Sequence, residues 1–141
     1  MKTIQKKKKV LKSKSAFVKI KLDIYDAYVI VSINQTDQEF QRSYIKNNPA
    51  SNIVLVDQYV KDTAKISERE LGKTIIYGGC VTVRLYSDLS TSIQMGTLVH
   101  ELFHATDMIL DDKGLQLVAG SDEAYSYLIG YLMEKTMDSY K

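Results

Sequence analysis

Two histidines placed four residues apart are the first feature of this sequence that could do chemistry. The segment LVHELFHATD, residues 98–107, contains His100, Glu101 and His104, and the chain has no other histidine. On an α-helix, side chains four positions apart point in nearly the same direction, so both imidazoles can aim a ring nitrogen at one point. Glu101 is rotated by about 100° from His100 and would lie beside that point. The H-E-x-x-H spacing therefore predicts a metal ion with a carboxylate next to it.

Zinc suits this pair of ligands, because neutral imidazole is among the ligands that zinc prefers. A catalytic zinc site typically has three protein ligands and one water, whose pKa the ion lowers toward neutrality. Glu101 could take the proton of that water and later pass it to a leaving amine. The pattern thus favours Zn²⁺ as the cofactor and peptide-bond hydrolysis as the reaction. The alternatives are histidines that merely lie on an exposed helix, or a metal that only stabilises the fold.

Two acids compete to be the third ligand, since the chain has no third histidine. Asp107 lies one turn beyond His104 and would have to reach back roughly 4.5 Å along the helix axis. It could instead accept a hydrogen bond from the His104 ring and orient it. Glu123 is the better candidate, because it begins the next predicted helix, and antiparallel neighbours would bring its first turn against the first helix. A carboxylate that interacts only with the helix dipole is the alternative for Glu123.

Two predicted helices must position these residues. The first, called the motif helix below, should begin near Thr91, where TSIQ has the residues of a capping box, and continue to about Leu110. The second should begin at Ser121, a good N-cap, and run to about Met137. Each has an apolar stripe at helical spacing, formed by Leu98, Leu102, Ala105 and Ile109 in the first and by Ala124, Leu128 and Leu132 in the second.

The rest of the chain predicts strands and one or two shorter helices. The alternating pattern of residues 17–33 predicts two strands with a turn between them. TDQE, residues 36–39, has the residues of a capping box and predicts the start of a helix. NIVLV, residues 52–56, predicts a third strand, and residues 58–71 predict a helix. KTIIYGGCVTVRLY, residues 73–86, predicts a hairpin that turns at its two glycines and leads to the motif helix.

These elements predict an α+β fold. A small mixed or antiparallel sheet would pack on the motif helix and on the following helix that carries Glu123. The length of the chain suits one domain, residues 16–141, preceded by a lysine-rich arm, residues 1–15.

HELFHAT followed by SDEAYSYLIGYL resembles the gluzincin group of zinc metallopeptidases, in which a glutamate on the helix after H-E-x-x-H completes the metal site. The short spacing is most similar to small single-domain members, the ImmA/IrrE-type peptidases and the minimal zincins found among phage proteins. The resemblance implies a minimal zincin fold, encoded by a phage or another mobile element. It also implies His100, His104 and Glu123 as ligands and Glu101 as the general base.

The same resemblance implies two further roles. In that group the strand before the motif helix lines the cleft and pairs with the substrate, so VTVRLY, residues 81–86, is expected to be an edge strand. The group also uses a histidine or a tyrosine to stabilise the oxyanion. Because no histidine remains, the expected residue is Tyr127, one turn from Glu123 on the same face, whereas Tyr125 is expected to point elsewhere.

Charge is divided unevenly along the chain. Residues 1–21 contain nine lysines and no acid, so the remaining 120 residues hold 10 basic and 17 acidic side chains. A lysine-rich arm of this kind binds polyanions by releasing their counterions. The arm therefore predicts a polyanion or a partner subunit as its ligand. It supports a second interpretation, a structural or assembly protein with a zincin fold, for example a virion component.

The composition also predicts the compartment. No apolar run approaches the roughly 20 residues of a membrane span, and the basic N-terminus is not followed by the apolar stretch of a secretory signal. We expect a cytoplasmic protein, or a virion protein if it is phage-encoded, that acts on a protein or peptide substrate and not at a membrane. Cys80 is the only cysteine and is best interpreted as a small buried apolar side chain.

Overall fold

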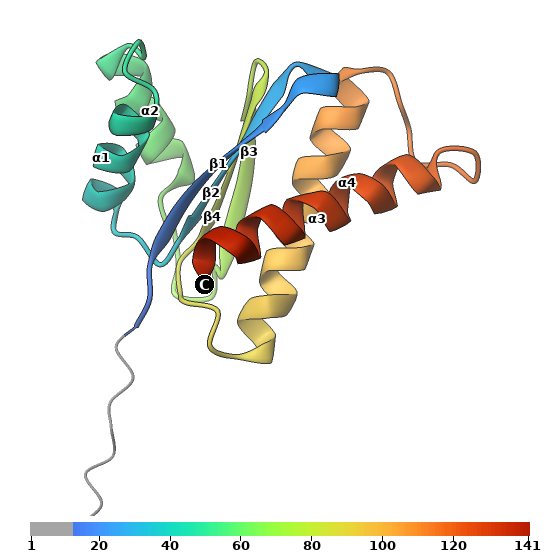
Figure 1. Ribbon diagram of the computed structural model, residues 1–141. Coiled ribbons are helices and arrows are strands. Elements are labelled where there is room, and N and C mark those ends of the chain that lie inside the picture. The colour runs from blue at the N-terminus through green and yellow to red at the C-terminus, as the bar shows by residue number, and fades with distance from the viewer. Residues whose placement is uncertain (1–12) are drawn as a thin grey trace, which may run out of the picture.

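The computed structural model describes residues 13–141 as a four-stranded sheet with helices on both faces (Figure 1). Its strands are β1 (Ala16–Leu22), β2 (Ala27–Ile33), β3 (Gly72–Tyr77) and β4 (Cys80–Leu85), in the order β1-β2-β4-β3. β1 is antiparallel to β2 and β3 is antiparallel to β4, whereas β2 and β4 are parallel. The predicted α+β class with a mixed sheet is confirmed. Most of the lysine-rich arm, residues 1–12, lies outside the described residues.

The helices form one layer on each side of the sheet (Figure 1). The helices α1 (Asp37–Asn47) and α2 (Ile53–Thr63) cover one face, and α3 (Ser92–Asp112) and α4 (Asp122–Tyr140) cover the other. A short 3₁₀ turn, η1 (Asp23–Tyr25), joins β1 to β2. None of the helices within residues 13–141 combines the length and the apolarity that crossing a membrane requires.

The larger core lies between the sheet and the two long helices. The alternating strand residues and the predicted stripe of the motif helix, here α3, meet in it: Val18, Ile20, Val29, Val31, Val81, Val83, Leu98, Leu102, Ala105 and Ile109 are all buried there. Burying one such aliphatic side chain contributes roughly 1.5–3 kcal/mol relative to leaving it exposed. This packing determines the rotation of α3, and therefore which of its side chains remain outside.

The smaller core lies on the opposite face and contains a buried charge. Ile30, Phe40 and Val56 are fully buried there. Beside them Arg84 of β4 is only 1% exposed, and it donates to Asp37 at 2.7 Å. Because β4 is covered on both faces, its polar side chain needs this partner in place of water.

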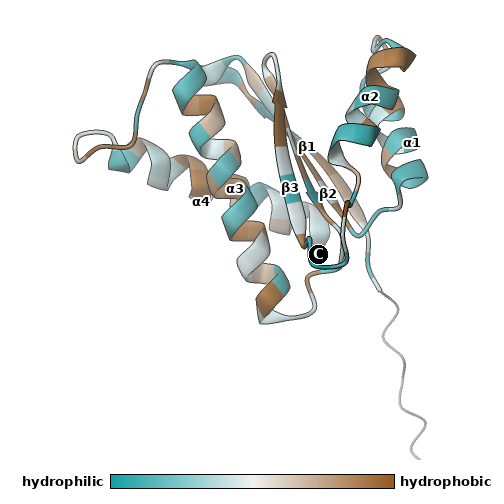
Figure 2. Cartoon of the chain, turned by 180° about the vertical axis from the view of Figure 1, so that it is seen from behind, coloured by the Kyte–Doolittle hydropathy of each residue, from teal (hydrophilic) through white to brown (hydrophobic). Residues whose placement is uncertain are grey.

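β4 is an interior strand, which corrects the expectation for VTVRLY. It pairs with β2 on one side and with β3 on the other, so the edge strands of the sheet are β1 and β3. The hairpin prediction is confirmed, with Gly78 at φ 58° in the turn. Its first strand, β3, provides the edge that lies beside α3 (Figure 2).

The predicted strand at residues 52–56 is wrong, because this run begins helix α2. The side chain of Asn52 accepts a hydrogen bond from the Val54 N–H at 2.9 Å and caps the helix. The side chains that α2 packs against the sheet and α1 are Val56, Tyr59, Val60 and Thr63, which share the spacing of a helical face. The sequence pattern predicts a strand at residues 52–56 and a separate helix at residues 58–71, so the helical face that begins at Val56 is not recognised from it. The helix predicted for residues 58–71 is therefore correct only as far as Thr63, where α2 ends.

Candidate functional site

The two histidines lie together on the outer side of α3. Their Nε2 atoms are 3.0 Å apart and their ring centroids 4.7 Å apart, and both side chains are exposed. α3 turns Leu98, Leu102 and Ala105 toward the sheet, which leaves His100 and His104 outside. Two nitrogens at this separation can both lie about 2.0–2.1 Å from one ion, the usual zinc–nitrogen distance. The structure thus brings two of the three predicted ligands together.

Glu101 lies beside the histidines but points toward the sheet. It is 7% exposed, and its Oε2 accepts a hydrogen bond from Thr74 Oγ1 of β3 at 2.5 Å. The same hydroxyl lies 3.2 Å from the backbone oxygen of Glu101. Within residues 13–141, no lysine or arginine forms an ion pair with this carboxylate. A neutral hydroxyl is therefore what holds it.

Gly72 allows β3 to approach α3 closely enough for this contact. A Cβ atom at position 72 would lie 2.9 Å from Glu101 Cγ and 2.9 Å from Leu85 Cδ2. Both distances are too short for carbon atoms, so a larger residue would displace the carboxylate or the strand. Sequence reasoning missed Gly72 and Thr74, although a glycine, here the first residue of β3, is a residue type that allows close approach of the backbone.

A groove of about 470 Å³ opens beside His100 and Glu101. It is lined by residues 69–72 and by Ile93, Gly96, Thr97, His100 and Glu101. At its rim, the backbone N–H of Ile66 holds the pKa of the Glu70 carboxyl below its usual range, and Lys73 acts in the same direction. A group placed in this groove would lie next to His100 and to the buried carboxylate of Glu101.

Asp107 contacts Tyr125 of α4. The Tyr125 hydroxyl donates to Asp107 Oδ1 at 3.2 Å and lies 3.3 Å from the backbone oxygen of Leu115. Burial raises the pKa of this hydroxyl, and the hydrogen bond to Asp107 raises it further. Tyr125 thus points away from the face of α4 that carries Glu123 and Tyr127, as expected, and it anchors the start of α4 to the motif helix.

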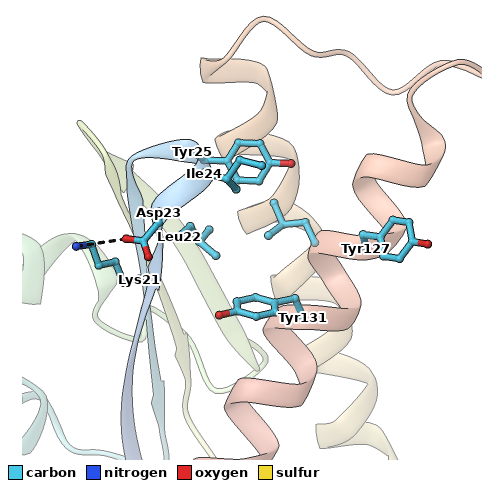
Figure 3. Close-up of a pocket in the computed structure, with 8 residues that line it drawn as sticks. Lys21, Leu22, Asp23, Ile24, Tyr25, Tyr127 and Tyr131 are labelled. Carbon is cyan, nitrogen blue, oxygen red and sulfur yellow. Dashed lines mark ion pairs between the residues drawn. The ribbon is translucent and has the colours of Figure 1, made fainter.

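Glu123 and Tyr127 are not brought to the histidines. Glu123 is exposed, and within residues 13–141 no three His, Cys, Asp or Glu side chains lie close enough to hold one ion. Tyr127 is 76% exposed and lines a different pocket, which β1, η1 and α4 form and which includes Tyr25 and Tyr131 (Figure 3).

The rotation of α4 explains both positions. Its buried side is formed by Tyr125, Leu128, Leu132 and Thr136. Glu123 and Tyr127 each lie two residues from Tyr125, about 200° around the helix. They therefore share one face, as the sequence predicts, but that face is opposite to the one that packs in the core.

No protein-family model, curated protein or solved structure matches this chain. What the site can do chemically follows from its own residues: a pair of converging imidazoles, a buried carboxylate on the adjacent residue, and a groove that leads to both.

Proposed function

We propose that this protein is a zinc-dependent endopeptidase whose active site lies on α3 at His100, Glu101 and His104. The observation that supports this most directly is the pair of Nε2 atoms 3.0 Å apart, with the carboxylate of the intervening residue held in place by Thr74. A metal site that serves only stability would have no use for an oriented carboxylate next to its ligands. A groove beside the site, of a size that accepts side chains, agrees with a peptide substrate.

Zn²⁺ is the proposed cofactor, and His100 and His104 would hold it. When bound, the ion would supply a Lewis acid and lower the pKa of water. The two imidazoles fit this ion, and a third ligand must come from an acid. Glu123 would reach the pair only if the first turn of α4 rotated toward it, and Asp107 would have to release Tyr125.

Glu101 is the proposed general base. Thr74 occupies Oε2, which leaves Oε1 to accept a proton from the attacking water and to deliver it to the leaving amine. A peptide would bind in an extended conformation along β3, the edge strand beside this carboxylate. Tyr127 has no role in this proposal, because it lines the pocket on the other side of α4.

The metal content of the purified full chain tests the proposal. After reconstitution with zinc, elemental analysis should find about one ion per chain. His104→Ala should lose it, because one of two imidazoles is removed. If Glu123 is the third ligand, Glu123→Ala should bind much less zinc than the wild type, while Glu134→Ala, an exposed acid on the same helix, should bind as much.

The zinc contents of the wild type and the variants test the motif and the third ligand separately. A reconstituted wild type without zinc would show that H-E-x-x-H is not a metal site in this chain. A zinc-loaded wild type with an equally loaded Glu123→Ala would exclude Glu123 as a ligand, and Asp107→Ala would then be the variant to compare.

Binding of polyanions by the lysine-rich arm is the second candidate function, and the charge distribution supports it. Residues 2–12 contain six lysines and no acid. Deleting them should weaken binding to duplex DNA of arbitrary sequence and reduce the slope of log affinity against log salt by up to about 5. The deletion should end before Ser13, because Asn34 bonds to Ser13 and to the Lys14 backbone in the folded body. Superimposable binding curves, measured by fluorescence anisotropy at several salt concentrations, would exclude this function.

A further inference from the structure

The open edge of β3 presents the backbone groups of alternate residues. The N–H of Tyr86 donates to the oxygen of Leu71 at 3.2 Å, in line with the register that pairs Gly72 with Leu85. In an antiparallel ladder, hydrogen-bonded and non-hydrogen-bonded pairs alternate. The pairs Lys73 with Arg84, Ile75 with Thr82 and Tyr77 with Cys80 are therefore bonded to β4. The N–H and C=O groups of Gly72, Thr74 and Ile76 consequently point away from β4, toward the open edge.

The side chain of Thr74 points to the general base. Successive side chains of a strand alternate between its two faces, and Thr74 lies on the face that packs against α3. There its hydroxyl donates to Glu101 Oε2 at 2.5 Å, while the neighbouring Lys73 bonds on the opposite side, to Glu70 at 3.0 Å. Thr74 thus offers its backbone to an added strand and its hydroxyl to Glu101.

Glu101 depends on this hydroxyl for its orientation. Its carboxylate is almost fully buried and, among the described residues, Thr74 is the side chain that donates a hydrogen bond to it. A glutamate side chain has three rotatable bonds, and ordering it costs rotamer entropy that a contact must offset. Gly72, on the same strand, lies close to the Glu101 side chain and limits the space in which that side chain can move. The position of the carboxylate is therefore determined by β3 as much as by α3.

We propose that Thr74 is a positioning residue that couples peptide binding at the β3 edge to the orientation of Glu101. A peptide that hydrogen-bonds to the Thr74 backbone would take a fixed position relative to the Glu101 carboxylate, because the Thr74 side chain holds that carboxylate. This inference rests on the proposed peptidase function. It adds that the edge strand aligns the general base as well as the substrate.

Thr74→Val tests the inference, because valine keeps the shape of threonine and removes the hydroxyl. With a peptide that the wild type cleaves, kcat should fall by about 10- to 100-fold, because a misplaced group costs this much. KM should change little, since the backbone groups that bind the peptide remain. Thr74→Ser should restore most of kcat, and the zinc content of all variants should equal that of the wild type.

Thr106→Val is the matched control. Thr106 is a buried threonine of α3 whose hydroxyl donates to the Leu102 backbone oxygen at 2.8 Å, away from the site. Its substitution should leave kcat unchanged. A second readout does not need activity: in a double-mutant cycle with Glu101→Ala, Thr74→Val should show a coupling of about tenfold or more in the unfolding equilibrium constant.

The outcomes separate the inference from the function on which it rests. An active wild type whose Thr74→Val variant keeps its kcat would overturn the inference alone. The inference alone would also be overturned if the kcat of Thr74→Ser were as low as that of Thr74→Val. A double-mutant cycle of Thr74→Val with Glu101→Ala that showed no coupling would have the same meaning. A wild type that binds zinc but cleaves no member of a peptide library would overturn the proposed function and the inference together.

Discussion

Glu101→Gln is expected to keep the metal and to lose peptide cleavage, with kcat lower by about 10²- to 10⁴-fold. Glutamine has nearly the size of glutamate and can still accept the hydrogen bond from Thr74, so the fold and the groove should persist. Its amide cannot take a proton from water at neutral pH. The measurement is the initial rate of peptide cleavage by wild type and variant at equal zinc content.

Glu134→Gln provides the control for this loss, because it makes the same chemical change at an exposed position of α4. It should cleave at the wild-type rate. If Glu101→Gln cleaved as fast as the wild type, Glu101 would not be the base. A variant that lost its zinc as well would point instead to a role of Glu101 in holding the ion.

Gly72→Ala is expected to destabilise the protein by about 1–3 kcal/mol, the usual cost of overpacking. The new methyl group would lie 2.9 Å from Glu101 Cγ and Leu85 Cδ2, and 3.2 Å from the Arg84 backbone oxygen, so side chains or strands must move apart. Because one of these atoms belongs to Glu101, the proposed general base, cleavage should fall together with stability. Urea unfolding of wild type and variant measures the change, as a lower midpoint at unchanged slope.

Gly96→Ala is the matched substitution, with the opposite expected sign. A Cβ at Gly96 would meet nothing within 4 Å, and the residue lies in the interior of α3. Alanine should therefore stabilise the helix by about 0.8–1 kcal/mol. A Gly72→Ala variant as stable as the wild type would mean that β3 and α3 are not in the close contact described above.

Much of the local structure was predictable, because it depends on residues near one another in the chain. Thr36 accepts from the Glu39 N–H at 3.1 Å, and Thr91 accepts from the Gln94 N–H at 3.3 Å, so these two predicted N-caps are confirmed. α4 does follow Ser121 as predicted, but the Ser121 side chain makes no capping hydrogen bond. The four-residue spacing of His100 and His104 placed both on one side of α3 for the same reason. The prediction at residues 52–56 failed, because a short apolar run is compatible with either helix or strand.

The sequence by itself determined the motif helix, the pairing of its histidines and the common face of Glu123 and Tyr127, since helical geometry depends only on spacing. Only the tertiary structure decided which way each face points. Burial of Tyr125 in the core rotates α4 so that Glu123 lies in solvent. Strand order likewise makes β3 the edge strand and brings Thr74 to Glu101, residues 27 positions apart. Such contacts follow from how the whole core packs, because no local pattern specifies which distant residue will face a buried carboxylate.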